Sequence, residues 1–171
     1  MTGDAMAADV VRSLGYLALG TRLKRIGERL QSQAQDVLAE EGVAYSVSLF
    51  PLMAALDRLG PLSVGELAEA LGTSQPGVTR MIAKLKSDGL VACGPAAGDA
   101  RMRPIMLSAS GKALVQRSKL RAWKRIERAV ERACAGLSGP LLTQLADLEE
   151  ELAATPLRQR VGRKETRHAP A

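Results

Sequence analysis

The sequence predicts a mostly helical fold with a single short β-hairpin. The chain has 171 residues, of which 46% are hydrophobic but only 2% aromatic. Its abundant alanine and leucine favour helices packed through small and aliphatic side chains. Apolar residues recur every three or four positions along most of the chain, which is the period of one helical face. Strand character is confined to residues 90–108, and the length suits one core rather than two.

The N-terminal segment predicts one long amphipathic helix over residues 8–40. This stretch contains no proline, and its apolar face is formed by Val10, Leu14, Leu17, Leu23, Ile26, Leu30, Ala34 and Val37. Gly42 is placed to end this helix. A shorter helix follows over residues 46–59, where Pro51 is tolerable only because it falls in the first turn.

Two short helices joined by a tight turn are predicted next. Ser63 and Glu66 have the spacing of a capping box, which marks a helix start, and Gly72 ends that helix. A second helix begins inside the turn GTSQPG, because an apolar face starts immediately after it. That face consists of Val78, Met81, Ile82 and Leu85. Helix, tight turn and helix make a helix-turn-helix unit.

A hairpin and further helices complete the predicted fold. Residues 90–93 and 103–108 have strand character on either side of a turn-rich segment, although Pro104 cannot donate to a ladder. Two helices with apolar seams are predicted after Ser110. We expect one domain over residues 1–154, with a lobe at 46–110 and flanking helices at 8–40 and 111–154. Residues 155–171 are basic and lack an apolar period, so a disordered tail is expected.

A helix-turn-helix followed by a glycine-tipped hairpin is the order of a winged helix. In that fold the second helix enters the DNA major groove, and the hairpin reaches the backbone or minor groove. The start of the second helix carries short polar and basic side chains, which can approach base edges and phosphates. The candidate DNA-binding residues are Ser63, Thr73, Ser74, Gln75, Pro76, Gly77, Thr79, Arg80, Lys84, Asp99, Arg101 and Arg103.

Two other interpretations of these residues stay open. They could simply cap and solubilise a structural helix, or the winged helix could be a protein-interaction module. The outward side chains include Gln75, Arg80 and Lys84, which favour DNA over an apolar or acidic docking surface. At the hairpin, we expect Asp99 to order Arg101 for the minor groove while Arg103 stays nearer the phosphates.

These residues resemble the multiple antibiotic resistance regulator (MarR) family of winged-helix transcription factors. GPLSVGELAEALGTSQPGVTRMIAKLKSDGLV is similar to the family's helix-turn-helix, and GDARMRPIMLSASGKAL is similar to its wing. Asp99 and Arg101 match the family's Asp-x-Arg pattern, whereas residues 95–98 are less basic than usual and Pro104 interrupts the return strand. The resemblance implies a homodimer, interlocked through its terminal helices, that represses transcription from a pseudo-palindromic operator.

The resemblance also implies a small, often phenolic or otherwise anionic, effector bound between the dimerisation helices and the DNA-binding lobe. Tyr16, Tyr45 and Phe50 are the candidate ligand-binding residues, although large residues on helices also serve as core. A thiol-based redox sensor is the alternative. Relatives that sense oxidants use a cysteine in the first helix, whereas this chain has Cys93 and Cys134, which we expect to be free thiols.

Composition argues against several other classes of protein. The single histidine, His168, and the lack of nucleophile, phosphate-binding and zinc-binding motifs lead us to expect no enzyme activity, no metal and no cofactor. No apolar run reaches the roughly 18 residues of a membrane span, and the N-terminus does not look like a signal peptide, so a cytoplasmic protein without a membrane partner is expected. The net charge of +6 suits a polyanionic partner, although most of the excess lies in the tail.

Overall fold

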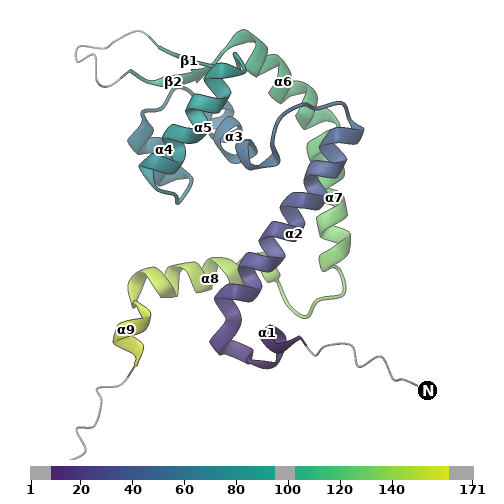
Figure 1. Cartoon of the computed structure of the whole chain (residues 1–171), viewed down its shortest axis with the longest axis vertical. Helices are drawn as coiled ribbons and strands as arrows, with labels where there is room; N and C mark the ends of the chain where they lie inside the picture. Colours follow the sequence, from purple (N-terminus) through teal and green to yellow (C-terminus); the bar gives the residue numbers. More distant parts are fainter. Residues whose placement is uncertain (1–8, 95–102, 162–171) are drawn as a thin grey trace, which may run out of the picture. The chain divides into compact units, whose positions relative to one another are not determined.

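The structure is a computed structural model that describes residues 9–94 and 103–161. It is mostly helical, with one two-stranded antiparallel sheet (Figure 1). The chain divides into two compact units, residues 1–129 and residues 130–171, which are described one after the other.

The predicted N-terminal helix is interrupted near its start, so the expectation of one helix over residues 8–40 is wrong. The segment consists of α1 (Val10–Ser13), the 3₁₀ helix η1 (Gly15–Ala18) and α2 (Leu19–Glu40). The break lies at Gly15, whose φ of 56° is in the left-handed region that glycine reaches without strain. The apolar period continues through this break, which is why it did not predict the interruption. Gly42 lies just beyond α2, as expected.

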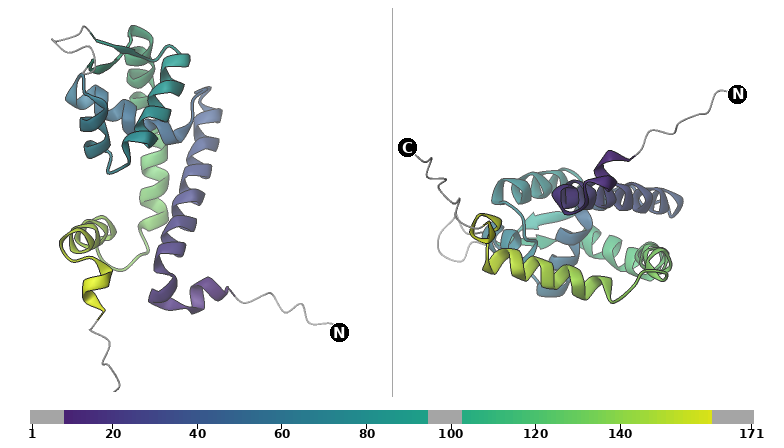
Figure 2. Two further views of the ribbon diagram at one scale, coloured as in Figure 1. Left: turned by 60° about the vertical axis from the view of Figure 1, so that its left-hand side comes forward. Right: turned by 90° about the horizontal axis from the view of Figure 1, so that it is seen from below.

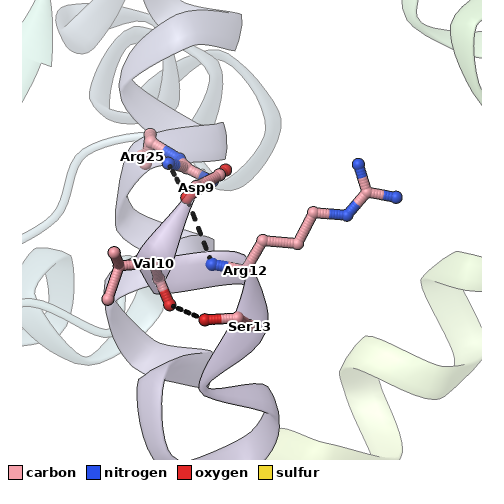
Figure 3. Close-up of polar contacts among 5 residues, drawn as sticks. All are labelled: Asp9, Val10, Arg12, Ser13 and Arg25. Carbon is pink, nitrogen blue, oxygen red and sulfur yellow. Dashed lines mark hydrogen bonds and ion pairs between the residues drawn. The ribbon is translucent and has the colours of Figure 1, made fainter. Parts of the chain in front are cut away.

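Side-chain hydrogen bonds hold α1 against α2 (Figure 3). Asp9 caps α1 by accepting a hydrogen bond from the backbone N–H of Arg12 at 3.1 Å. Its two carboxylate oxygens also accept from the Arg25 guanidinium of α2, at 3.1 and 2.8 Å. Within α1, the Ser13 hydroxyl donates to the carbonyl oxygen of Val10. The pKa of Asp9 is lowered, first by the hydrogen bonds from Arg25 and then by that from Arg12.

The lobe has the predicted order of a winged helix. Its helical elements are η2 (Val47–Leu49), α3 (Phe50–Leu59), α4 (Val64–Ala70) and α5 (Gln75–Ser87). Ser46 caps the first of these elements, and Pro51 lies in the first turn of α3, as its chemistry requires. One face of each helix supplies the core, and the largest fully buried side chains of the lobe are Leu52, Met53, Leu67, Val78 and Leu85.

The hairpin pairs β1 (Val91–Cys93) with β2 (Ile105–Leu107), so that Val91 lies opposite Leu107. A bridge between Leu62 and Ile105, which the sequence did not reveal, attaches the segment before α4 to this sheet. Pro104 precedes β2, and its carbonyl oxygen accepts from the backbone N–H of Gly94 at 2.7 Å. Pro104 therefore takes part in the hairpin as a hydrogen-bond acceptor. It does not need to donate a hydrogen bond to the ladder.

Helix α6 (Ala109–Leu120) is anchored to the end of α5 by two serines at its start. The hydroxyls of Ser108 and Ser110 lie 2.6 and 2.7 Å from the carbonyl oxygen of Gly89, as donors to it. A side chain at Gly111 would collide with the carbonyl oxygen of Leu90, which explains the glycine at this position.

A second break separates α6 from α7 (Ala122–Cys134) at Arg121, whose φ and ψ of −128° and −79° are not helical. The predicted apolar seam starts only at Trp123, so it did not locate this break. The start of α7 lies beside the C-terminal end of α2 (Figures 1 and 2). There the Arg125 guanidinium donates to the carboxylates of Glu41 and Glu40, at 2.6 and 2.8 Å.

The second unit contains the end of α7, α8 (Leu141–Ala154) and α9 (Leu157–Arg160). The helical turn α9 corrects the expectation that disorder begins at residue 155. Arg160 holds this turn by donating to the Glu151 carboxylate at 2.7 Å and to the carbonyl oxygens of Glu151 and Thr155. These hydrogen bonds satisfy the last carbonyl groups of α8. Polar contacts of this kind leave no apolar period in the sequence, so the pattern did not predict the turn. The rest of the predicted tail, residues 162–171, lies outside the described residues.

Candidate nucleic-acid interface

The recognition-helix candidate α5 begins with a polar turn that is exposed to solvent. Ser74 is its N-cap, and the Ser74 hydroxyl accepts from the backbone N–H of Gly77 at 3.3 Å. Gln75 and Pro76 form the first helical positions, and both are exposed. The opposite face of α5 is buried through Val78, Ile82 and Leu85, so the burial of this face fixes which side chains point outward.

Gly77 lets the two hydroxyl residues of the turn fold over the helix start. A Cβ at this position would lie 3.3 Å from the Ser74 hydroxyl and 3.4 Å from the Thr73 hydroxyl. The contact with Ser74 is tighter than an ordinary van der Waals distance, and the contact with Thr73 is at its lower limit. The glycine therefore allows close packing within the turn.

The Gln75 side chain lies against the first turn of α4. Its amide nitrogen is 3.8 Å from the position of a Cβ on Gly65. Ser63, the N-cap of α4, forms the predicted capping box. Its hydroxyl accepts from the Glu66 N–H at 3.2 Å, and its own N–H donates to the Glu66 carboxylate at 2.7 Å. Hydrogen bonds from the backbone and side chain of Ser63 lower the pKa of Glu66.

Thr79 and Lys84 already have partners within α5. The Thr79 hydroxyl donates to the carbonyl oxygen of Gln75 at 2.9 Å, so in this rotamer it presents its methyl group and an acceptor lone pair. The Lys84 ammonium pairs with the Asp88 carboxylate at 2.9 Å. Arg80 is exposed, and none of the ion pairs among residues 9–94 and 103–161 involves it. Arg80 is therefore freer than Lys84 to bind DNA.

The hairpin places one further cation near the lobe surface. Arg103 is exposed and lies two residues before β2. The other two wing candidates, Asp99 and Arg101, lie outside the described residues. At the base of the hairpin, the Lys86 ammonium of α5 lies 2.9 Å from the sulfur of Cys93 on β1. Cys93 and Cys134 are both free thiols, as expected.

The three candidate ligand-binding aromatics do not come together. Tyr45 and Phe50 are neighbours, with ring centroids 5.2 Å apart in an edge-to-face arrangement. Tyr16 precedes α2, whereas Tyr45 follows it, so a helix about 33 Å long lies between them. The Tyr16 side chain is 94% exposed.

A cavity of about 590 Å³ adjoins Tyr45. It is lined by Gln35, Ala39, Gly42, Val43, Ala44, Tyr45 and Ser46. Sequence periodicity did not single out Gln35, because its importance lies in contacts made ten and twelve residues further along the chain. Among the described residues, no cluster of His, Cys, Asp and Glu side chains could hold a metal ion. None of the helices in the described part of the chain is long and apolar enough to span a membrane.

The fold and the exposed start of α5 define a winged helix with a recognition-helix surface. The model of the MarR family matches residues 49–102, which cover α3, α4, α5 and β1. Residues 49–102 are therefore similar to the winged helix of the MarR family of transcription regulators, and this confirms the resemblance inferred from the sequence.

Solved structures of MarR-type regulators have the same fold. BpsR of Bordetella bronchiseptica, whose DNA binding is regulated by 6-hydroxynicotinic acid, is 21% identical over 80% of this chain and 94% of its own, with a TM-score of 0.63. A MarR/EmrR family regulator from Acinetobacter sp. ADP1 is 16% identical over 79% and 92%, with a TM-score of 0.62. Apo wild-type MarR from E. coli is 16% identical over 78% and 96%, with a TM-score of 0.56. No curated protein sequence matches the chain.

Proposed function

We propose that this protein is a cytoplasmic, homodimeric, sequence-specific repressor that binds a pseudo-palindromic DNA operator. The observation that carries the proposal is the two-sided character of α5. Its inner face is buried in the lobe core, while Gln75, Thr79 and Arg80 are exposed on the other. A helix anchored in this way presents its first turns rigidly to a groove, which is what discrimination between base pairs requires.

The side chains of this surface have separate roles in the proposal. The Gln75 amide can pair with an adenine edge, and the Arg80 guanidinium can pair with a guanine edge or a phosphate. The hydroxyls of Ser63, Thr73 and Ser74 supply donors for the backbone. Lys84 contributes a positive charge that favours binding to DNA of any sequence, but its ion pair with Asp88 reduces this contribution. In the wing, Asp99 and Arg101 keep their proposed role in the minor groove.

Dimerisation is supported by the apolar side chains that the flanking helices leave exposed. Leu23, Ile26 and Leu30 follow one another along α2, each at least 39% exposed, and Leu142 and Leu152 are exposed on α8. Large exposed apolar residues in series are typical of protein–protein interfaces. A second copy of the chain would cover them and place two recognition helices about 34–36 Å apart, one turn of DNA.

An effector site is the finer part of the proposal. The cavity next to Tyr45 lies where α2 ends and the lobe begins, and it has room for a small organic molecule. Regulation of BpsR by 6-hydroxynicotinic acid makes a small aromatic acid the first class to test. We also propose that binding of the effector releases the protein from DNA.

Selection of duplexes from a random pool by the purified protein, followed by footprinting, tests the central claim. Gln75→Ala and Arg80→Ala should each cost about 1–3 kcal/mol on the selected duplex and relax the preference at one position. Lys84→Ala should weaken binding to selected and random duplexes alike, by a smaller amount because Lys84 is paired. Equal losses on both duplexes for all three variants would show that α5 does not read sequence. A monomeric mass in light scattering would contradict the dimer.

A further inference from the structure

The link between α2 and α3 is held by the side chain of Gln35, which bonds the backbone on either side of Ser46. The carbonyl oxygen of Tyr45 accepts from the Gln35 amide of α2 at 3.3 Å. The Gln35 amide oxygen in turn accepts from the backbone N–H of Val47 at 2.8 Å. Gln35 therefore ties both ends of the turn that leads into the winged helix to the last turns of α2.

The hydroxyl of Tyr45 reaches in the other direction, to α6 and α7. It donates to the Ser118 hydroxyl of α6 at 3.3 Å and accepts from the indole N–H of Trp123 in α7 at 3.3 Å. These two partners lie on either side of the helix break at Arg121. A single oxygen atom thus joins the lobe to both helices that follow it.

The Tyr45 hydroxyl oxygen is buried, so water cannot readily replace its hydrogen-bond partners. Tyr45 is 5% exposed and Ser118 is 1% exposed, so neither hydroxyl can exchange its partner for water without local opening. Phe50 packs between the two other aromatic rings, at centroid distances of 5.2 Å from Tyr45 and 5.3 Å from Trp123. Burial raises the pKa of Tyr45, which keeps the phenol protonated and able to donate.

We propose that the Tyr45 hydroxyl is a positioning group that fixes the winged helix on α6 and the start of α7, and so sets which half-site spacing the dimer accepts. The inference rests on the proposed function, because half-sites matter only to a dimeric DNA-binding protein. The lobe core is formed by many apolar side chains, so removal of one oxygen should leave the recognition surface intact. The substitution should instead make the attachment of the winged helix to the helices that follow it less stiff.

The chain offers a matched pair of substitutions that each remove one phenolic oxygen. Tyr45→Phe deletes the buried hydroxyl, and Tyr16→Phe deletes an exposed one for which no hydrogen bond is present among the described residues. The DNA probes are a duplex selected by the wild-type protein, the same duplex with one or two base pairs inserted at its centre, and a duplex carrying one half-site. Unfolding midpoints in urea establish that each variant is folded.

We expect Tyr45→Phe to bind the single half-site as the wild type does and to tolerate the inserted base pairs better. The ratio of affinities for the original and lengthened duplexes should fall about fivefold or more, the lower end of the coupling between distinct sites. Trp123 is the only tryptophan of the chain, so its fluorescence emission reports the loss of its hydrogen-bond acceptor. Tyr16→Phe should match the wild type in all three measurements.

Two results would overturn the inference. One is a Tyr45→Phe variant with altered Trp123 emission but the spacing ratio of the wild type, since the hydroxyl would then be only a core hydrogen bond. The other is an equal loss on the half-site and the full duplex. If Tyr45→Phe does not fold, Ser118→Ala removes the acceptor instead, and the same spacing result is required of it. A wild-type protein that selects no duplex contradicts the proposed function itself, before any variant is compared, and the inference falls with it.

Discussion

The winged-helix lobe and the helices that flank it bury their apolar side chains very differently. In the lobe, Leu52, Met53, Leu67, Val78 and Leu85 are fully buried in one continuous core. Along the 22 residues of α2 only Leu38 is buried, and α8 has no buried residue. The lobe side chains thus lie in a continuous core, whereas the apolar faces of α2 and α8 are not covered within their own units.

This difference separates two sources of stability. Burial of the lobe core is intramolecular, so its contribution does not depend on protein concentration. Burial of the exposed faces of α2 and α8 requires a partner, which we propose to be a second copy, and its contribution rises with concentration. Substitutions of the same kind in the two regions should therefore have different consequences.

The largest expected effect comes from a leucine of the lobe core. Leu67→Ala should lower the free energy of unfolding by about 2–5 kcal/mol, because Leu67 is fully buried and its removal leaves a cavity. Urea unfolding at two protein concentrations should give the same loss at both. Leu23→Ala removes the same atoms from the exposed face of α2 and should act mainly on dimer dissociation. Equal, concentration-independent losses for the two variants would abolish the distinction between the regions.

A second large effect is expected where α6 meets the lobe. Gly111→Ala should destabilise the protein by about 3 kcal/mol or more, because the new Cβ meets the carbonyl oxygen of Leu90, a backbone atom that cannot move aside. Gly136→Ala is the matched control, since no atom lies within 4 Å of its Cβ position. Thermal unfolding of the two variants compares them directly. A Gly111→Ala protein as stable as the control would mean that α6 is held less closely than the structure indicates.

The sequence predicted the lobe well because its signals are local. The capping box at Ser63, the cap at Ser74 and the buried face of α5 each depend on residues within a few positions of one another. The break at Gly15 was missed because the apolar period continues across it, and the break at Arg121 was missed because the predicted seam starts only at Trp123. The local sequence pattern shows which face of a helix is apolar, but it does not show whether the helix axis bends.

The candidate site shows the same division between local and distant contacts. The exposed residues at the start of α5 were found from their spacing, and the matched segment of the MarR family contains them. The connection of Tyr45 to Ser118 and Trp123 spans more than 70 residues, so no periodicity predicts it. Tyr16 was grouped with Tyr45 by residue type alone, and the structure separates the two.

A smaller effect is expected at alkaline pH, at the boundary between the two regions. The pKa of Tyr45 is raised above its ordinary value of 10.0, chiefly by burial. The folded protein therefore keeps this proton after the unfolded chain has lost it, and stability falls as the pH rises above 10. Tyr45→Phe should show a shallower decline in urea midpoint between about pH 9 and pH 11. Tyr16→Phe should keep the wild-type slope, and parallel slopes for all three proteins would contradict the assignment.

The smallest effect is expected at the far end of α2, where an ion pair on the surface holds α1. The hydrogen bonds from Arg25 and Arg12 lower the pKa of Asp9 below its ordinary value of 3.8 (Figure 3). A lowered carboxyl pKa stabilises the folded form above the ordinary value, and this contribution is lost as the pH falls through the folded pKa. Because the pair is exposed, its loss should free α1 and leave the lobe unchanged.

Asp9→Asn tests this expectation at neutral pH by removing the charge and keeping the size of the side chain. Hydrogen exchange should become faster at the Arg12 and Ser13 amides, which the capped turn protects, and should not change at amides of α5. Asp36→Asn, at an exposed position of α2, is the control and should change neither. If Asp9→Asn also accelerated exchange in α5, then α1 and the lobe would be coupled, and the flanking helices would not be separable from the core in the way that their burial indicates.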